Sequence, residues 1–152
     1  MRIAGTFYFD HFRSGALLEQ RTAPNLIVNT GYAAVAGLII QTGSTSPFSY
    51  LAIGQSTQAA ASTDIALYSE ITTGGGERSL ATLSRVTTDV TNDTPQLAKT
   101  FTFTTTGTFA ITEAAVFASS SSGATMLCRQ IFAAINVVAT DTLNLTYKLD
   151  LD

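Results

Sequence analysis

Charged side chains are scarce in this sequence. Lys, Arg, Asp and Glu together make up 12% of its 152 residues, against 45% hydrophobic residues, and the formal net charge is -3. This is about half the charge of an ordinary soluble domain. The Lys and Arg residues form no cluster, so the sequence has no basic patch for phosphates, and we expect no direct contact with nucleic acid. A weakly charged surface is instead typical of proteins that become buried against other proteins.

Cysteine, histidine and tryptophan are almost absent as well. Cys128 is the only cysteine, so no disulfide forms within the chain, and its apolar neighbours predict a buried side chain. His11 is the only histidine, and because it lies beside charged residues we expect it at the surface or in an interface rather than on a metal. The lack of Trp disfavours an aromatic platform for carbohydrate. We predict no catalytic, cofactor-binding or metal-binding residues, and hence no enzyme.

A long apolar run is also missing. Residues 1–9 lack the basic start and apolar core of a signal peptide, and no stretch elsewhere is long enough to span a bilayer. We therefore expect no membrane contact. The protein is expected to be made in the cytoplasm, where it stays soluble or is built into a larger assembly.

Strand patterns are abundant, and the clearest lies between Phe109 and Phe132. Two extended segments, Phe109–Phe117 and Met126–Phe132, flank the small polar residues Ser119–Gly123, which predicts an antiparallel hairpin. Both faces of the first segment are apolar or small, so we expect this strand to be covered on both sides at the centre of a β core. Phe117 and Phe132 are predicted to face that core.

Glu113 is the single carboxylate of this hairpin, and Arg129 stands on the returning strand. A charge among apolar neighbours needs a partner, and a hairpin of this length could bring the two side chains together. The alternative is a catalytic acid with a raised pKa, but no second carboxylate, histidine or nucleophile lies at a useful spacing. We predict a structural ion pair or a rim position for Glu113.

The rest of the chain predicts further strands and one helix. Residues 142–151 alternate apolar and polar, as in a strand with one solvated face. Tyr32–Ile40 has helical spacing and can be capped by Asn29 or Thr30, and this short apolar helix is expected to plug one end of the β structure. With eight or nine strands at hairpin spacing, the prediction is an all-β, jelly-roll-like antiparallel β-sandwich with one short helix.

The N-terminal segment is unusually aromatic. Residues 1–14 are predicted to form a strand or an arm, ahead of a single β-sandwich domain at 15–152. One core cannot hold aromatic residues on both faces of a strand, so we expect Tyr8, Phe12 and Arg13 to contact a neighbouring subunit or another protein. A chain without residues 1–13 would then still fold but bind its partner weakly.

Several motifs occur in an order that is similar to that of a known group of proteins. They are G-A-L-L-E at 15–19, N-L-I-V-N-T-G at 25–31, F-S-Y-L-A-I-G at 48–54, K-T-F-T-F at 99–103, I-T-E-A-A-V-F at 111–117 and M-L-C-R-Q-I-F at 126–132. This order resembles small structural proteins of tailed bacteriophages, found among capsid decoration (cement) proteins and among tail or fibre components. The resemblance covers most of the chain from Gly15 onward.

The resemblance implies a non-enzymatic component of the phage virion. The main expectation is a capsid decoration protein, a homotrimer on the capsid surface that binds the assembled major capsid protein and stabilises the head. The alternative is a structural or adhesion module of a phage tail, fibre or baseplate. Broad, weakly charged β surfaces suit either role, because many copies on a lattice can make modest contacts effectively permanent.

Overall fold

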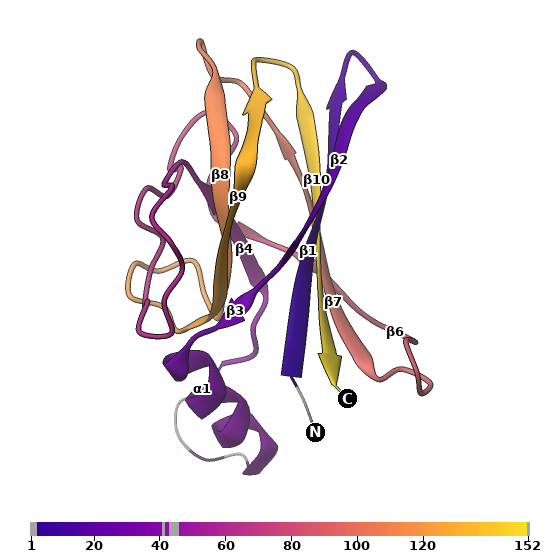
Figure 1. Cartoon of the computed structure of the whole chain (residues 1–152), viewed down its shortest axis with the longest axis vertical. Helices are drawn as coiled ribbons and strands as arrows, with labels where there is room; N and C mark the ends of the chain where they lie inside the picture. Colours follow the sequence, from indigo (N-terminus) through magenta and orange to yellow (C-terminus); the bar gives the residue numbers. More distant parts are fainter. Residues whose placement is uncertain (1–2, 41, 43–45, 152) are drawn as a thin grey trace.

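Two antiparallel β-sheets pack face to face in the computed structural model, which describes residues 3–40, 42 and 46–151 (Figure 1). Sheet A has the strand order β2 (Ala16–Pro24), β1 (Ile3–Arg13), β10 (Thr142–Leu151), β7 (Thr94–Thr102) and β6 (Thr82–Val86). Sheet B has the order β3 (Leu26–Ile27), β9 (Met126–Val137), β8 (Phe109–Phe117), β4 (Tyr50–Gly54) and β5 (Ser79–Leu80). The all-β sandwich that the sequence predicts is therefore confirmed.

Three hairpins, β1–β2, β6–β7 and β8–β9, each lie within one sheet, and the chain crosses between the sheets after β2, β5, β7 and β9. These strand orders are compatible with a jelly roll, whose finer connectivity stays a prediction. The central β8–β9 hairpin forms as the sequence indicates. β9 continues to Val137, beyond the expected end at Phe132.

Alternation along the strands creates the core between the sheets. On β10 the inward positions are buried and the intervening ones are partly exposed, as the sequence predicts. β1 contributes Phe7 and Phe9, and the ring of Phe9 packs 4.3 Å, centroid to centroid, from that of Phe132 on β9. The core thus joins the two sheets through large apolar side chains of the first, ninth and tenth strands.

β8 is buried on both faces, and the second cover is a long loop. Residues 55–78, called the covering loop below, run over the outer face of sheet B, where Glu70 forms a single bridge with Gly54. Leu67 of this loop joins Ala115 and Phe117 of β8 in a second, smaller apolar cluster. The apolar residues on both faces of β8 are explained by these two layers.

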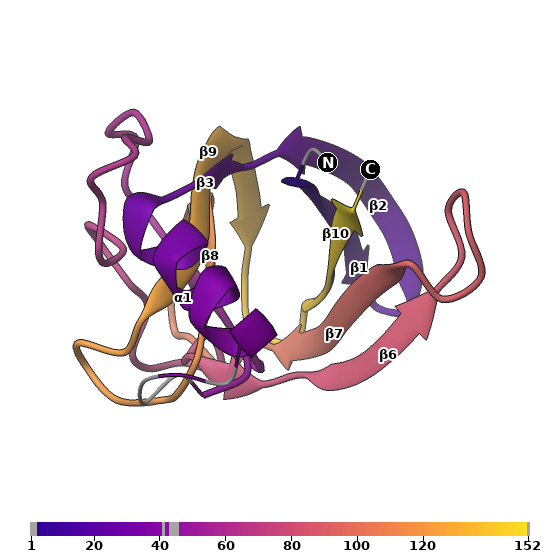
Figure 2. The ribbon, with the colours of Figure 1, turned by 90° about the horizontal axis from the view of Figure 1, so that it is seen from below.

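The one helix in the described part of the chain, α1 (Asn29–Ile40), lies at one end of the sandwich beside β9, as Figure 2 shows from below. It begins three residues before the predicted start. Gly31 packs directly against the backbone carbonyl of Leu127, where a larger side chain would not fit. The Thr30 hydroxyl donates to the carbonyl oxygen of Met126 and so holds the helix against β9.

The N-terminal strand is an interior strand of sheet A. β1 pairs with β10 on one side and with β2 on the other, and Phe7 and Phe9 are fully buried. Its removal would separate β2 from the sheet and open the core. The expectation that a chain lacking residues 1–13 still folds is therefore wrong, and the segment belongs to the sandwich rather than forming a free arm.

Candidate functional site

The structure places two of the three residues predicted to contact a partner on one face of β1. Tyr8 and Phe12 occupy alternate positions of β1 that face away from the core, and Tyr8 is 38% exposed with the Lys148 ammonium 5.3 Å from its ring centroid. Arg13 points to the other side. Its guanidinium makes two hydrogen bonds to Asp141, at 2.8 and 2.7 Å. A partner contact through Tyr8 and Phe12 stays a prediction, whereas the Arg13 head group is engaged within the chain.

His11 is buried, so its expected surface position is wrong. Nε2 lies 2.9 Å from Oδ2 of Asp141, and Nδ1 lies 3.5 Å from Oε1 of Glu19. Asp141, in the turn between β9 and β10, also accepts from the backbone N–H of Val138. The hydrogen bonds from Arg13, followed by the one with His11, hold the pKa of Asp141 well below its usual range. These groups tie β1 to the β9–β10 turn.

A second group of buried charges is the Arg129 cluster, formed by Arg129, Glu113 and Asp64 together with the exposed Tyr68. Arg129 on β9 and Glu113 on β8 have no exposed surface, and Nη2 lies 2.8 Å from Oε2. The predicted structural ion pair is thus confirmed. A second carboxylate, that of Asp64 in the covering loop, lies 2.9 Å from Nη1 of Arg129.

Backbone groups of the covering loop complete this cluster. Arg129 donates to the carbonyl oxygens of Gln58 and Ala59, and Glu113 accepts from the N–H groups of Tyr68 and Ser69. A buried ion pair needs such extra hydrogen bonds to offset the loss of water. The cluster therefore fastens the covering loop to sheet B.

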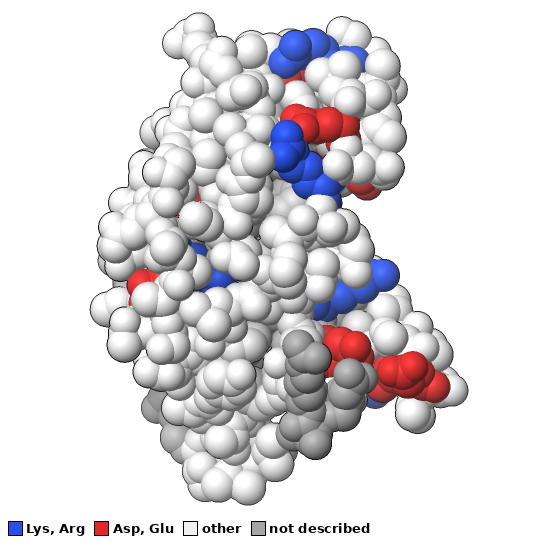
Figure 3. All heavy atoms as spheres, in the orientation of Figure 1, with Lys and Arg blue, Asp and Glu red and all other residues white. Residues whose placement is uncertain are grey.

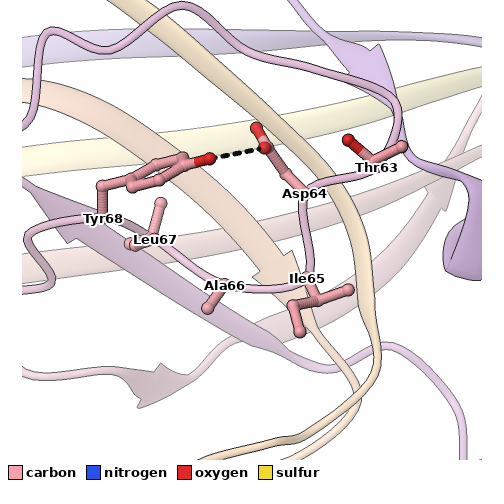
Figure 4. A pocket seen from close by; sticks show the side chains of 6 residues that line it. All are labelled: Thr63, Asp64, Ile65, Ala66, Leu67 and Tyr68. Atoms are coloured by element: carbon pink, nitrogen blue, oxygen red, sulfur yellow. Dashed lines mark hydrogen bonds between the residues drawn. The ribbon is translucent and has the colours of Figure 1, made fainter.

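A small pocket of about 190 Å³ lies on the covering loop, lined by residues 63–68. Figure 4 shows the Tyr68 hydroxyl donating to the Asp64 carboxylate at 3.1 Å, while Ile65 points away from this bond. That hydrogen bond is the first cause of a raised pKa of Tyr68. Because the one carboxylate that lines the pocket is already engaged by Tyr68 and Arg129, the pocket offers little free chemistry to a ligand.

Arg78 fastens the other end of the covering loop. Its guanidinium binds Glu70 through two hydrogen bonds of 2.8 and 2.7 Å and stacks 3.6 Å from the ring centroid of Phe117. It also donates to the carbonyl oxygens of Ser119 and Ser121 in the β8–β9 turn. Arg129 on β9 and Arg78 at the end of the covering loop thus hold this loop at two places.

These charged groups hold structure together. Every carboxylate oxygen of Glu113 already accepts a hydrogen bond, which leaves it poorly placed as an acid or base. Within the described residues no group of three or more His, Cys, Asp or Glu side chains is placed to hold a metal ion. Cys128 is fully buried, as predicted, and burial raises the pKa of its thiol to about 12.

The surface of the protein offers a clearer candidate for a binding site than the buried charged groups do. On the face in Figure 3 charged atoms are sparse, and none lies over the end that α1 occupies in Figure 1. α1 contains no charged residue, and Tyr32, Ile39 and Ile40 are 51%, 68% and 67% exposed. A helix that is apolar on all sides is normally buried. The sequence carries this signal in its uncharged segment 29–40, although the pattern there predicted only a helix that plugs one end of the sandwich.

Comparison with known protein families, with curated proteins and with solved structures found no match to this chain. Among the helices that the structure describes, none is long and apolar enough to cross a membrane. The function must therefore be argued from the fold and the surface.

Proposed function

We propose that this chain is a non-enzymatic structural protein of a tailed-phage virion, a capsid decoration protein that binds the assembled major capsid protein from outside and stabilises the head. The observation that carries the proposal is the exposed apolar helix α1, with Ile39 and Ile40 about two-thirds exposed at one end of the sandwich. The end that carries α1 faces the capsid lattice.

Three features support this role. The buried charged groups serve to hold the covering loop and the β9–β10 turn, so binding falls to the surface. The surface is poor in charge, which suits broad contacts with protein and gives no footprint for nucleic acid. A sandwich fastened by the buried Arg129 and the partly buried Arg78 is also a rigid body, and rigid bodies lose little conformational entropy when they bind a lattice.

The test uses phage particles from which the protein has been removed. Purified protein is added back, and its binding is measured by co-sedimentation, followed by the temperature at which the particles release DNA. We expect wild-type protein to bind and to raise that temperature. Ile40→Lys should bind at least tenfold more weakly, because a charge at the centre of an apolar contact loses its water.

The matched control is Ile65→Lys, which changes an equally exposed isoleucine, 67% in both cases, on the covering loop. This control should bind like wild type. Equal binding by both variants would contradict the placement of α1 on the lattice. Complete and stripped particles that release DNA at the same temperature would contradict the decoration role itself.

The number of copies per particle distinguishes a decoration protein from the alternative, a component of the tail, fibre or baseplate. A decoration protein covers the lattice in hundreds of copies, whereas a tail component is present in a few to dozens. A stained gel of purified particles gives this number directly. The homotrimer expected from the resemblance stays a prediction that the molecular mass in solution tests.

A further inference from the structure

The outer edge of β6 is an open strand edge. β6 pairs with β7 on one side, from Thr82 opposite Ala98 to Val86 opposite Thr94, and no described strand pairs on its other side. Thr82 to Arg85 are all exposed. In an antiparallel strand, alternate residues direct their N–H and C=O groups away from the partner, so this edge presents unpaired donors and acceptors.

The edge strands β2, β3 and β5 are less suited than β6 to pairing with another chain. β3 and β5 are only two residues long. On β2, Leu18 forms a bulge, and Glu19 and Arg21 stand opposite the buried His11 and Phe9 and so point inward. Short strands, bulges and inward charges are the usual means of preventing edge pairing. β6 has five residues, a regular register and a single charge, Arg85.

β6 also carries an apolar side chain that its surroundings leave largely uncovered. Leu83 stands opposite Leu97 on the same face, yet Leu83 is 53% exposed and Leu97 only 5%. Figure 2 shows the reason, since β6 and β7 run out beyond sheet B and their connecting turn projects from the body. A further strand beside β6 would cover Leu83.

We propose that β6 pairs with β6 of a second copy of this chain, antiparallel about a two-fold axis at Ser84. The two copies of sheet A then form one continuous sheet. About this axis Leu83 stands opposite Arg85 of the second copy and Thr82 opposite Val86, so the lone charge never meets itself. The strand is thus complementary to itself in backbone, shape and charge, as a two-fold contact requires.

The first measurement is the mass in solution across a concentration series. Wild type should approach twice the 16.0 kDa of the chain. Leu83→Lys places a lysine opposite Arg85 of the second copy and should halve the apparent mass, whereas Leu83→Glu places a carboxylate there and should preserve the pair. Leu17→Lys on the β2 edge, where Leu17 is 47% exposed, is the control and should remain paired.

The second measurement reports the register. Ser84→Cys puts two thiols on the two-fold axis, where opposed Cβ atoms come close enough for a disulfide, so mild oxidation should give a covalent dimer. Cys128 is buried and does not interfere. Leu17→Cys should not cross-link.

A wild-type chain that stays at 16.0 kDa at all concentrations would overturn the proposal. A three-chain mass would also overturn it, and would support instead the homotrimer that the resemblance implies, which this two-fold pair replaces. A pair that Leu83→Lys leaves intact, or one that Leu83→Lys and Leu83→Glu disrupt equally, would overturn it as well. These outcomes leave the binding of α1 to a capsid lattice untouched, because they are read without any particle.

Discussion

Arg129 and Glu113 face each other across the central hairpin with no exposed surface on either side chain, and their closest atoms lie 2.8 Å apart. The pair joins neighbouring strands of sheet B and, through Asp64, the covering loop. One guanidinium therefore connects three segments of the chain, and two carboxylates depend on it.

Arg129→Met should destabilise the fold by about 3–5 kcal/mol, because it leaves the Glu113 and Asp64 carboxylates buried without their cation. Urea-induced unfolding measures this loss. The control is the triple variant in which Glu113→Gln and Asp64→Asn are added, which should recover part of the stability because no charge is left buried. If Arg129→Met alone were as stable as wild type, the Arg129 cluster would contribute nothing to the stability of the fold.

Phe117→Ala and Phe132→Ala should differ in cost. Phe117 is 1% exposed and also carries the Arg78 guanidinium on its ring, so its truncation should cost about 3–5 kcal/mol. Phe132 faces the core between the sheets, as predicted, but is only half-buried, so its truncation should cost less. Phe117 lies instead in the smaller cluster under the covering loop. The free energies of unfolding of the two variants test this order. A larger loss of stability for Phe132→Ala than for Phe117→Ala would contradict it.

Asp141 should make the fold sensitive to acid. Its pKa is lowered in the folded state, chiefly by the hydrogen bonds from Arg13, while an unfolded aspartate has a pKa of about 3.9. This stabilisation is fully present above that value and is lost as the pH falls below it. We expect the melting temperature of wild type to fall below about pH 4 and that of Asp141→Asn to be lower at neutral pH but to change less with acid. Parallel pH profiles for both proteins would refute this role.

Cys128 should be unreactive in the folded protein. Burial raises the pKa of its thiol to about 12, so very little thiolate is present at neutral pH and reagents have no access. A chromogenic disulfide reagent at pH 8 should detect no thiol in buffer and one per chain in concentrated urea. Rapid reaction in buffer would mean that the hairpin opens easily.

The local features of the fold could be predicted from the sequence, because alternation records the two sides of a strand. The β8–β9 hairpin and the Glu113–Arg129 pair follow from one short stretch. Asp64 could not be predicted as the third member, since only the path of the covering loop brings it to Arg129. Its sequence neighbours contain no sign of that path.

The error at His11 has a different cause. Its charged neighbours suggested an exposed position, but the inward side of β1 runs through Gly5, Phe7, Phe9 and His11 at every second residue. Strict alternation would have placed the imidazole inside. The pairing of Arg13 with Asp141, in contrast, joins residues far apart in sequence and leaves no periodic trace.

The pairing of β1 with β10 governs the order in which this chain can fold. Ile3 stands opposite Leu151, so almost the whole chain is closed into a loop before the middle of sheet A exists. Contacts of such long range make folding slow, whereas the β8–β9 hairpin closes over a short turn and can form early. On the ribosome, Phe7 and Phe9 emerge long before the strand that covers them has been made, and until then they offer an apolar surface to chaperones and to other nascent chains.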